Sequence, residues 1–344
     1  MIETTQPVIS EAKTQLRRPR LGFVGIGWIG KNRLEAVQRS GLAEIVAIYD
    51  PLLREELSSI SPAPERVLSF ESLLERDLDG VVIATPSALH AQQAIAALSA
   101  GRAVFCQKPL ARTAAETRAV VSAAEAADRL LSVDLSYRFT TGIAKIRQLI
   151  EAGELGELHA IEMKFHNAYG PDKAWFYDRK LSGGGCLLDL GIHLVDMALS
   201  SFHRPEVNRV SGSLLTGGER WTIDSAKVED YAAAQITLQS GAVIQLACSW
   251  RAHAGCEADI EATFFGSKGG ACFRNVNGSF YDFRAEHFLS DRSRRVLAEP
   301  PDDWGGRAIL DWVQRLVHSP RYSSNIEMSV TAAEVIDAIY DSAR

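Results

Sequence analysis

A glycine triad near the start of the chain, Gly25-x-Gly27-x-x-Gly30, constrains the fold more than any other feature of the sequence. It follows a short apolar run over residues 21–27 and precedes a helical pattern over residues 28–40. This spacing between a strand and a helix is typical of a turn that binds a dinucleotide. The first glycine permits the tight turn, the second lets the backbone approach a pyrophosphate, and the third lets helix and strand pack closely.

The carboxylate of Asp50 favours one dinucleotide over the other. It ends a second predicted strand about twenty residues after the triad, where a carboxylate accepts hydrogen bonds from ribose hydroxyls and repels a 2′-phosphate. We therefore expect NAD to be favoured over NADP as the cofactor, and Arg54 lies close enough in sequence to soften that preference. Trp28 and Ile29 open the following helix, and their N–H groups are expected to face the phosphates.

The first part of the chain alternates apolar runs with helical patterns. Strand-like runs cover residues 80–86, 103–109 and 131–136, and alanine-rich helical patterns cover residues 88–100 and 113–129. Near-continuous apolar strands separated by helices are typical of a parallel sheet with helices on both faces. This part of the sequence therefore predicts a doubly wound α/β domain.

After about residue 135 the pattern changes to long strands joined by short turns. A helix is expected over residues 137–152, and two more close the chain, at about 305–318 and 329–343. Between them lie six strand patterns, at residues 157–167, 228–238, 242–252, 258–266, 270–276 and 279–285. Short connections between long strands predict antiparallel neighbours. The second part is therefore expected to be an α+β domain on a large open, mainly antiparallel sheet.

These patterns divide the chain into three segments. We expect a flexible tail over residues 1–19, a dinucleotide-binding domain over residues 20–135, and a substrate-binding and oligomerisation domain over residues 136–344. The last helix is placed where it can pack back on the dinucleotide-binding domain. The arginines at the end of the tail are interpreted as solvated.

Composition excludes several other classes of protein. A formal net charge of −6 argues against a nucleic-acid partner, because phosphate binding needs a basic surface. No apolar run reaches the length of about 18 residues expected of a membrane span. The five cysteines form no Cys-x-x-Cys pair, so we expect neither a disulfide framework nor a bound metal. A cytoplasmic protein with reduced thiols is the expectation.

Polar residues follow the ends of two predicted strands in the first domain. Thr85 and Pro86 end one of them, and His90 follows four residues later. Ligands of an open parallel sheet lie outside the carboxyl ends of its strands, so these residues are expected to line the nicotinamide end of the cofactor site. An ordinary strand-to-helix turn and a histidine on a helix surface are the alternative interpretations.

The sequence Gln107-Lys108-Pro109 ends the next strand over the same crevice. A lysine in this place can hold a reacting oxygen and stabilise charge that develops on it. Pro109 removes a backbone donor and restricts the backbone of Lys108. Lys108 is therefore a candidate for both the cofactor site and the reacting centre, although a surface lysine is the alternative.

A second candidate for chemistry follows the three glycines at residues 183–185. Asp189 and His193 come next in a leucine-rich stretch and share one face if a helix starts after the glycines. A histidine with an ordinary pKa of about 6.5 suits proton transfer to and from a hydroxyl. Asp189 is placed to orient the imidazole or to bind a neighbouring hydroxyl, although an Asp/His pair on a helix is usually structural.

Together these motifs resemble the glucose–fructose oxidoreductase, inositol dehydrogenase and rhizopine catabolism (Gfo/Idh/MocA) family of oxidoreductases. The resemblance runs from about residue 20 to the C-terminus and includes Tyr137-Arg138-Phe139, Trp175, residues 265–269 and residues 335–340. It implies a Rossmann domain and assigns Lys108 as the active-site lysine, His193 as the general acid/base and Asp189 as a substrate-binding partner.

The resemblance also implies the kind of partner. Family members oxidise or reduce sugars and cyclic polyols, and their second domain presents its open sheet to another subunit, so a homodimer or homotetramer is expected. Candidate residues at the substrate rim are Tyr137, Arg138, His166, Asn167, Tyr169 and Trp175. One residue departs from the pattern, because the family usually has glutamate where this chain has Gln107.

Three functions are compatible with these observations. The first is an NAD-dependent dehydrogenase of a sugar, sugar derivative or inositol, with Lys108, Asp189 and His193 at its reacting centre. The second is a glycoside hydrolase that uses tightly held NAD in a transient oxidation, which predicts cleavage without net NADH. The third, suggested by Gln107, is a dinucleotide sensor without turnover.

Overall fold

A parallel sheet occupies the N-terminal part of the computed structural model, which describes residues 17–53, 62–203 and 205–343. Its six strands lie in the order β3-β2-β1-β4-β5-β6. The strands are β1 (Arg20–Val24), β2 (Glu44–Tyr49), β3 (Glu65–Arg66), β4 (Gly80–Ile83), β5 (Ala103–Cys106) and β6 (Leu131–Val133). All five pairings are parallel, so the predicted doubly wound sheet is confirmed.

Helices cover this sheet, and three of them follow the largely buried strands β1, β4 and β5. They are α1 (Trp28–Ser40), α2 (Phe70–Leu74), α3 (Ser87–Ser99) and α4 (Ala114–Ala127). A fifth helix, α8 (Arg307–His318), packs against α1 and β5, although it follows the second sheet in the chain. The indole of Trp312 lies 5.7 Å from the ring of Phe105, and a Cβ at Gly80 would come within 2.7 Å of this indole.

The second sheet has nine strands in the order β15-β14-β13-β12-β7-β11-β10-β8-β9. They are β7 (Leu158–Asn167), β8 (Val207–Thr216), β9 (Glu219–Arg220), β10 (Tyr231–Leu238), β11 (Val243–Ser249), β12 (Ala258–Gly266), β13 (Gly270–Asn275), β14 (Phe283–Phe288) and β15 (Arg294–Ala298). Seven of the eight pairings are antiparallel, which confirms the predicted sheet class. The exception is the central pair of β7 and β11, which is parallel.

The sequence interpretation was wrong about the neighbours of β11 and β12. The two strands follow each other in the chain, but β7 lies between them and pairs with both. β7 lies in the middle of the sheet because alternate side chains, Ile161, Met163 and Phe165, are buried in the core beneath it. A strand that enters the sheet early leaves no local signal that later strands will flank it.

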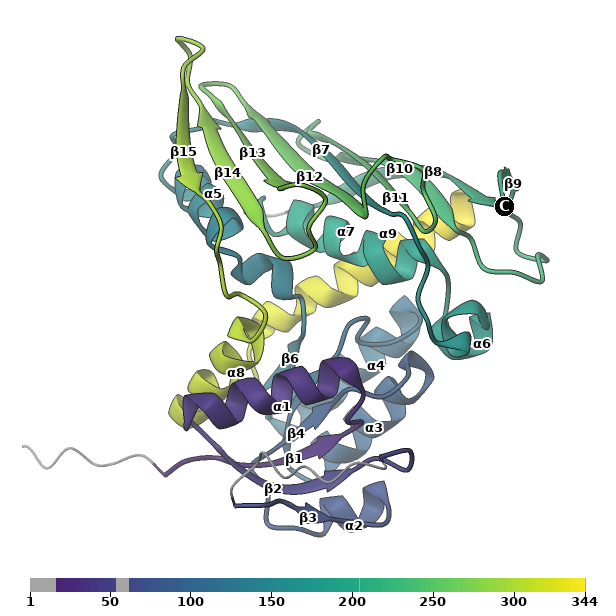
Figure 1. The fold of residues 1–344 in the computed structure, drawn as a ribbon, viewed down its shortest axis with the longest axis vertical. Helices are drawn as coiled ribbons and strands as arrows, with labels where there is room; N and C mark the ends of the chain where they lie inside the picture. Colours follow the sequence, from purple (N-terminus) through teal and green to yellow (C-terminus); the bar gives the residue numbers. More distant parts are fainter. Residues whose placement is uncertain (1–16, 54–61, 204, 344) are drawn as a thin grey trace, which may run out of the picture.

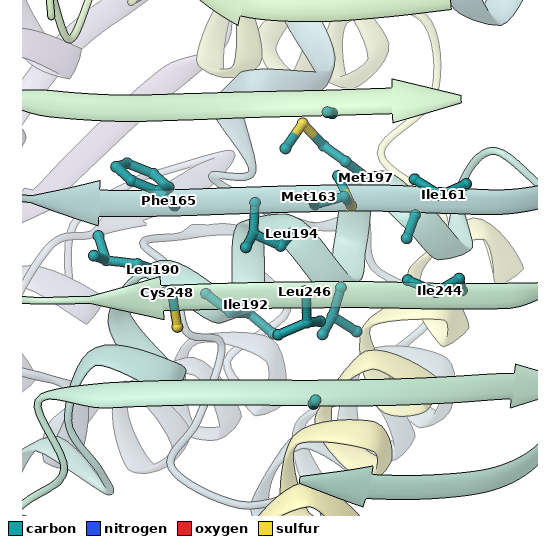
Figure 2. Close-up of a cluster of buried hydrophobic side chains, with 14 of the residues drawn as sticks. Ile161, Met163, Phe165, Leu190, Ile192, Leu194, Met197, Ile244, Leu246 and Cys248 are labelled. Carbon is teal, nitrogen blue, oxygen red and sulfur yellow. The ribbon is translucent and has the colours of Figure 1, made fainter. Parts of the chain in front are cut away.

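In the described part of the chain, helices cover one face of the second sheet and leave the other without a helix. They are α5 (Thr141–Glu151), α7 (Ile192–Leu199) and α9 (Met328–Ser342), with a short α6 (Arg179–Ser182) beside the first sheet's layer. Figure 2 shows Leu190, Ile192, Leu194 and Met197 at the centre of the core. They pack against inward side chains of β7 and β11, and the opposite face of the sheet carries no helix in Figure 1.

The helix expected over residues 137–152 is interrupted. A 3-10 turn covers Ser136–Phe139, and α5 begins at Thr141. Thr140 between them is extended, with φ −65° and ψ 143°, and its side chain accepts a hydrogen bond from the N–H of Ile143. Threonine at this position therefore caps a new helix and ends the preceding turn.

The two sheets are joined by more than the connecting chain. The carboxylate of Asp337 on α9 accepts a hydrogen bond from the backbone N–H of Ala114 at the start of α4, at 2.9 Å. Two residues that the sequence interpretation placed in a tail contact the first sheet: Arg17 forms an ion pair with Asp79 at 2.7 Å, and the carbonyl oxygen of Pro19 accepts the N–H of Glu44 at 2.8 Å. The division into domains at residue 135 stays a prediction. None of the helices in the described ranges is long and apolar enough to cross a membrane.

Candidate active site

A cleft of about 1400 Å³ lies at the carboxyl ends of the first sheet's strands and is closed on its other side by residues of the second part of the chain. From the first part it takes the glycine turn and the residues that follow β2, β4 and β5. From the second part it takes residues that follow β7, the start of α7, and the segment before α8. The predicted crevice therefore exists, and it joins both halves of the sequence.

The glycine turn leaves open space on its cleft side. Gly25 adopts a φ of +83°, and a Cβ there would lie 2.5 Å from the carbonyl oxygen of Ala84. A Cβ at Gly30 would lie 2.1 Å from the carbonyl oxygen of Gly25, so α1 and β1 approach closely only because these residues are glycines. A Cβ at Gly27 would meet nothing within 4 Å. The backbone at Gly27 therefore borders open space at the N-terminus of α1, where a phosphate group can bind.

Asp50 supports this turn from the end of β2. Its carboxylate accepts the N–H of Ile26 at 2.6 Å and the N–H of Leu52 at 2.7 Å. Both contacts hold the carboxylate at the cleft with lone pairs left for further donors. Arg54, which was expected to soften the preference for NAD, lies outside the described residues.

His90 joins the ends of β4 and β5. Its Nδ1 lies 2.7 Å from the carbonyl oxygen of Pro109, and its Nε2 lies 2.7 Å from the carbonyl oxygen of Thr85. Burial lowers the pKa of His90, and the charge of Lys108 lowers it further. All four residues line the cleft, and both nitrogens of the His90 ring lie within hydrogen-bond distance of a backbone carbonyl oxygen, to one of which a neutral ring donates. Its contribution is therefore to hold the two strand ends together.

Lys108 reaches across the cleft to the second part of the chain. Its Nζ donates to Oδ1 of Asp189 at 2.6 Å and to the carbonyl oxygen of Asp189 at 2.8 Å. The peptide bond between Lys108 and Pro109 is cis. The Lys108 side chain is 19% exposed and that of Asp189 is 15% exposed, so this ion pair is largely shielded from water but open to the cleft.

The segment that carries Asp189 and His193 is not a simple α-helix. A π-helical turn covers Leu187–Gly191 and runs into α7, which begins at Ile192. The sequence placed both side chains on one face of a helix, and both line the cleft. Asp189 is oriented further by Trp250, whose Nε1 donates to Oδ2 at 3.1 Å. π-turns of this kind are frequent at functional sites.

His193 is buried against the ring of Tyr137, with ring centroids 4.9 Å apart. Its Nδ1 is buried and has no hydrogen-bond partner within the described structure. Burial holds the pKa of His193 well below its usual value, and the positive charges of Lys108 and Arg33 lower it further. A neutral imidazole that borders the cleft is suited to accept a proton from a ligand hydroxyl.

Gln107 points beneath the site to a buried carboxylate. Its Nε2 donates to Oδ2 of Asp134 at 2.7 Å, and its Oε1 accepts the N–H of Lys108 at 3.1 Å. Asp134 also accepts the Nε of Arg33 at 2.5 Å and the hydroxyl of Ser136. Because Asp134 already supplies one negative charge here, an amide at position 107 provides the donor that a carboxylate lacks.

Sequence reasoning missed Glu229, which is fully buried behind the glycine run. Its carboxylate accepts the N–H of Gly185 at 2.9 Å, the N–H of Leu187 at 3.0 Å and the hydroxyl of Tyr340 at 2.8 Å. These bonds fix the backbone that leads into the π-turn. A lone glutamate at the start of a strand carries no local signal for this contact.

The predicted substrate rim is only partly assembled. Tyr137, Asn167, Tyr169 and Trp175 line the cleft. His166 instead donates to or accepts from the hydroxyl of Ser249 at 2.8 Å.

Arg138, also predicted at the substrate rim, has a partner within the protein. Its guanidinium forms a bidentate ion pair with Asp196, a residue of α7 that is 1% exposed. The charge of the arginine is therefore paired with a buried carboxylate. Burial raises the pKa of Asp196, and the neighbouring arginine opposes that rise. Removing Arg138 would leave a buried carboxylate unpaired, which explains the residue without a substrate.

Comparisons with known proteins agree with this architecture. The model of an oxidoreductase family with an NAD-binding Rossmann fold matches residues 19–135, and the GFO/IDH/MocA C-terminal domain matches residues 143–272. Together the two models span more than half of the chain. Levoglucosan dehydrogenase in complex with NADH superposes with a TM-score of 0.81 at 23% identity, over 95% of this chain and 97% of its own, which establishes the fold.

Two curated relatives give a similar result. Myo-inositol 2-dehydrogenase of Thermotoga maritima is 29% identical over 81% of this chain and 81% of its own length. D-glucoside 3-dehydrogenase of Escherichia coli is 26% identical over 77% of each. The predicted family, enzyme class and NAD cofactor are thereby confirmed. The chain belongs to the GFO/IDH/MocA family of NAD-binding oxidoreductases.

Proposed function

We propose that the protein is a dehydrogenase that transfers a hydride between NAD and a secondary hydroxyl or carbonyl carbon of a sugar, a sugar derivative or an inositol. The observation that carries this proposal is the contact between Lys108 and Asp189 beside His193, at the end of the cleft that begins at the glycine turn. Relatives named as glucoside and inositol dehydrogenases support the substrate class.

In this proposal the residues at the ends of β1, β2, β4 and β5 would hold the cofactor. The backbone at Gly25 and Gly27, with the N–H groups of Trp28 and Ile29, holds the pyrophosphate, and Asp50 holds the adenosine ribose. The carboxylate of Asp50 disfavours a 2′-phosphate, which makes NADP the weaker ligand. Thr85, Pro86, His90 and Gln107 line the remainder of the site. Bound NAD supplies the electrophilic carbon that accepts the hydride.

The side chains of the chain itself manage the proton and the oxygen. His193, neutral because of its lowered pKa, takes the hydroxyl proton as the carbon is oxidised. Lys108 donates a hydrogen bond to the same oxygen and stabilises the negative charge that develops on it. Asp189, which is oriented by the indole N–H of Trp250, holds the ammonium of Lys108 in place and presents a further acceptor to a neighbouring hydroxyl. Tyr137, Tyr169 and Trp175 border the substrate.

We propose further that the protein is a cytoplasmic homodimer or homotetramer assembled through the face of the second sheet that carries no helix. A shallow hollow of about 670 Å³ on this face is lined by residues of β7, β8, β10, β11 and β12. Sedimentation of the purified protein tests this: a monomer at concentrations where the enzyme is fully active would contradict it.

The experiment that tests the activity is a screen of the purified protein against sugars, inositols and sugar acids, with NAD and NADP in parallel. We expect NADH to form with at least one cyclic polyol or sugar, and faster than NADPH. Binding of NAD without turnover of any compound would indicate a sensor. Cleavage of a glycoside without accumulation of NADH would indicate a hydrolase.

A further inference from the structure

The cleft extends beyond the reacting centre along a first wall of aromatic rings. The ring of His193 lies 4.9 Å from that of Tyr137, and the ring of Tyr137 lies 5.1 Å from that of Trp304. The indole Nε1 of Trp304 then donates to the carbonyl oxygen of Tyr281 at 2.9 Å. All four residues line the cleft, so one side of it is aromatic from the histidine outward.

A second group of aromatic residues starts at Asp189. Trp250 donates its indole N–H to Asp189, and the ring of Phe176 lies 6.4 Å from that of Trp250. The indole of Trp175 stacks on Phe176 with 3.8 Å between centroids, and both of these rings line the cleft. A ligand held at Lys108 and His193 would therefore have two sets of aromatic side chains beside it in the cleft.

The outer ends of these walls are uncovered. Tyr169 is 53% exposed and Tyr281 is 56% exposed, although both line the cleft, and the ring of Tyr169 lies 5.9 Å from that of Phe280. Aromatic rings left in water at the mouth of a site supply apolar area and π-faces to a planar group of a ligand. A free monosaccharide at the reacting centre would leave these rings unused.

The charges near the mouth do not suit a diphosphate. Lys173 is paired with Asp172 at 2.8 Å, and Lys108 is paired with Asp189. Of the other cations among the described cleft residues, Arg33 is held by Asp134, and Arg39 lies in the last turn of α1, far along the helix from the reacting centre. Asp302, which is paired with Arg307, and Asp303 also line the cleft, and phosphate recognition needs cations free to bind it.

We propose that the substrate is a glycoside whose sugar bears an uncharged aromatic aglycone, with the sugar at Lys108 and His193 and the aglycone against Tyr169 and Tyr281. This inference rests on the proposed function and specifies its substrate class. It distinguishes aryl glycosides from free sugars, which lack the planar group, and from sugar nucleotides, whose diphosphate the mouth does not accommodate.

The test measures binding by calorimetry to the full chain saturated with NADH. The ligands are methyl and phenyl β-glycosides of glucose, galactose and mannose, together with UDP-glucose. For at least one sugar we expect the phenyl glycoside to bind about tenfold more tightly than the methyl glycoside, since burial of one ring contributes affinity of this order. UDP-glucose should bind no better than the methyl glucoside.

Two variants locate the preference. Tyr169→Ala and Tyr281→Ala should each reduce the phenyl-to-methyl ratio by several-fold, while Tyr322→Ala, which removes a half-buried ring outside the cleft and away from the second sheet, should leave it unchanged. Equal affinities for phenyl and methyl glycosides of all three sugars, a preference that survives both tyrosine variants, or tightest binding of UDP-glucose would overturn the inference. Loss of the oligomer in the tyrosine variants, with no phenyl preference in the wild type, would likewise overturn it.

Turnover is followed separately as NADH formation from the same glycosides with NAD. A phenyl preference in binding without oxidation of any glycoside contradicts the proposed function and leaves the aromatic mouth as a binding site. Oxidation of methyl and phenyl glycosides with equal kcat/KM contradicts only the inference about the aglycone.

Discussion

The ammonium of Lys108 lies 2.6 Å from the carboxylate and 2.8 Å from the backbone carbonyl of Asp189. The two residues are 81 positions apart in the sequence. Lys108 follows β5 of the first sheet, and Asp189 lies in the π-turn before α7, a helix that covers the second sheet. This contact therefore fixes how the two parts of the chain meet at the cleft. It also holds the lysine in the position from which it is proposed to contact a reacting oxygen.

The first prediction concerns this lysine. Lys108→Met keeps the length of the side chain and removes its charge, so kcat/KM for sugar oxidation should fall by about 10²–10³, the loss typical of an electrostatic donor in an active site. Binding of NAD, measured by calorimetry, should change by less than a few-fold. Lys173→Met, which removes a lysine paired with Asp172 at the rim of the same cleft, is the matched control. Wild-type kcat in Lys108→Met would contradict the assigned role.

The second prediction concerns the pH at which His193 acts. Oxidation requires the neutral imidazole, and burial holds the pKa of His193 well below its usual value of 6.5. The rate should therefore stay on its plateau as the pH falls through 6.5 and decline only at lower pH. His193→Asn should reduce kcat by roughly 10²–10⁴ and abolish this acid limb. An acid limb centred above pH 6.5 in the wild type would show that another group titrates.

The third prediction tests the cause of that pKa without turnover. The charge of Lys108 is the second largest cause of the lowered pKa of His193. Lys108→Met should thus raise the pKa of His193, because it removes a positive charge that opposes protonation. Titration followed by NMR, with the histidine signal assigned from His193→Asn, measures this shift. An unchanged or lower pKa would mean that the two groups are not coupled as the geometry indicates.

Much of this site is predictable from sequence where its signals are local. The glycine turn and Asp50 follow a known spacing, and Asp189 and His193 are close enough in sequence to share a face. The pairing of Lys108 with Asp189 is not local, and only the resemblance to a family placed the two residues at one centre.

Other features carry no sequence signal that pattern analysis can read. The insertion of β7 between β11 and β12 depends on the packing of the whole sheet. Glu229 looks like the first polar residue of an ordinary strand, and its three hydrogen bonds come from segments that lie up to 111 residues away. Arg138 matched the substrate rim by resemblance, but the buried carboxylate of Asp196 that engages it is visible only in three dimensions.

The fourth prediction concerns Gln107. Gln107→Glu would place a second carboxylate where the amide now donates to Asp134 at 2.7 Å. The repulsion between the two carboxylates favours binding of a proton by one of them in the folded state, which raises the folded pKa of that carboxyl. The folded variant is therefore more stable at low pH, where this proton is bound, and loses stability as the pH rises. The thermal midpoint of the variant should fall further below that of the wild type at pH 8 than at pH 5. The double variant Gln107→Glu/Asp134→Asn, which restores a single negative charge, should recover most of the difference.

A pH-independent difference between Gln107→Glu and the wild type would contradict this account of the pair. It would mean that Arg33, which donates to Asp134 at 2.5 Å, compensates both carboxylates equally.

The fifth prediction concerns Glu229 as a residue that positions the site without contacting the substrate. Glu229→Gln keeps the shape of the side chain but replaces one carboxylate oxygen, an acceptor, with an NH2 group, a donor. This group lies beside the N–H groups of Gly185 and Leu187, which are donors themselves. We expect a loss of about 1.5–3 kcal/mol in the free energy of unfolding, since each bond to a buried carboxylate is of this order. Because the π-turn loosens, kcat should fall while the affinity for NAD is kept. Tyr340→Phe removes only the third donor and should have a smaller effect on both quantities.

The final prediction separates cofactor choice from folding. Asp50 accepts two backbone N–H groups and is proposed to hold the ribose of NAD. Asp50→Asn offers a donor where two donors already point, so KM for NAD should rise by about 10- to 100-fold, the range expected when a hydrogen bond to a charged group is lost. The repulsion of a 2′-phosphate disappears with the charge, so the ratio of kcat/KM for NAD to that for NADP should move towards NADP. Asp79→Asn, at a carboxylate that also accepts a backbone N–H at 2.7 Å but lies outside the cleft, should change stability alone. An unchanged NAD-to-NADP ratio in Asp50→Asn would place the determinant of cofactor choice elsewhere in the cleft.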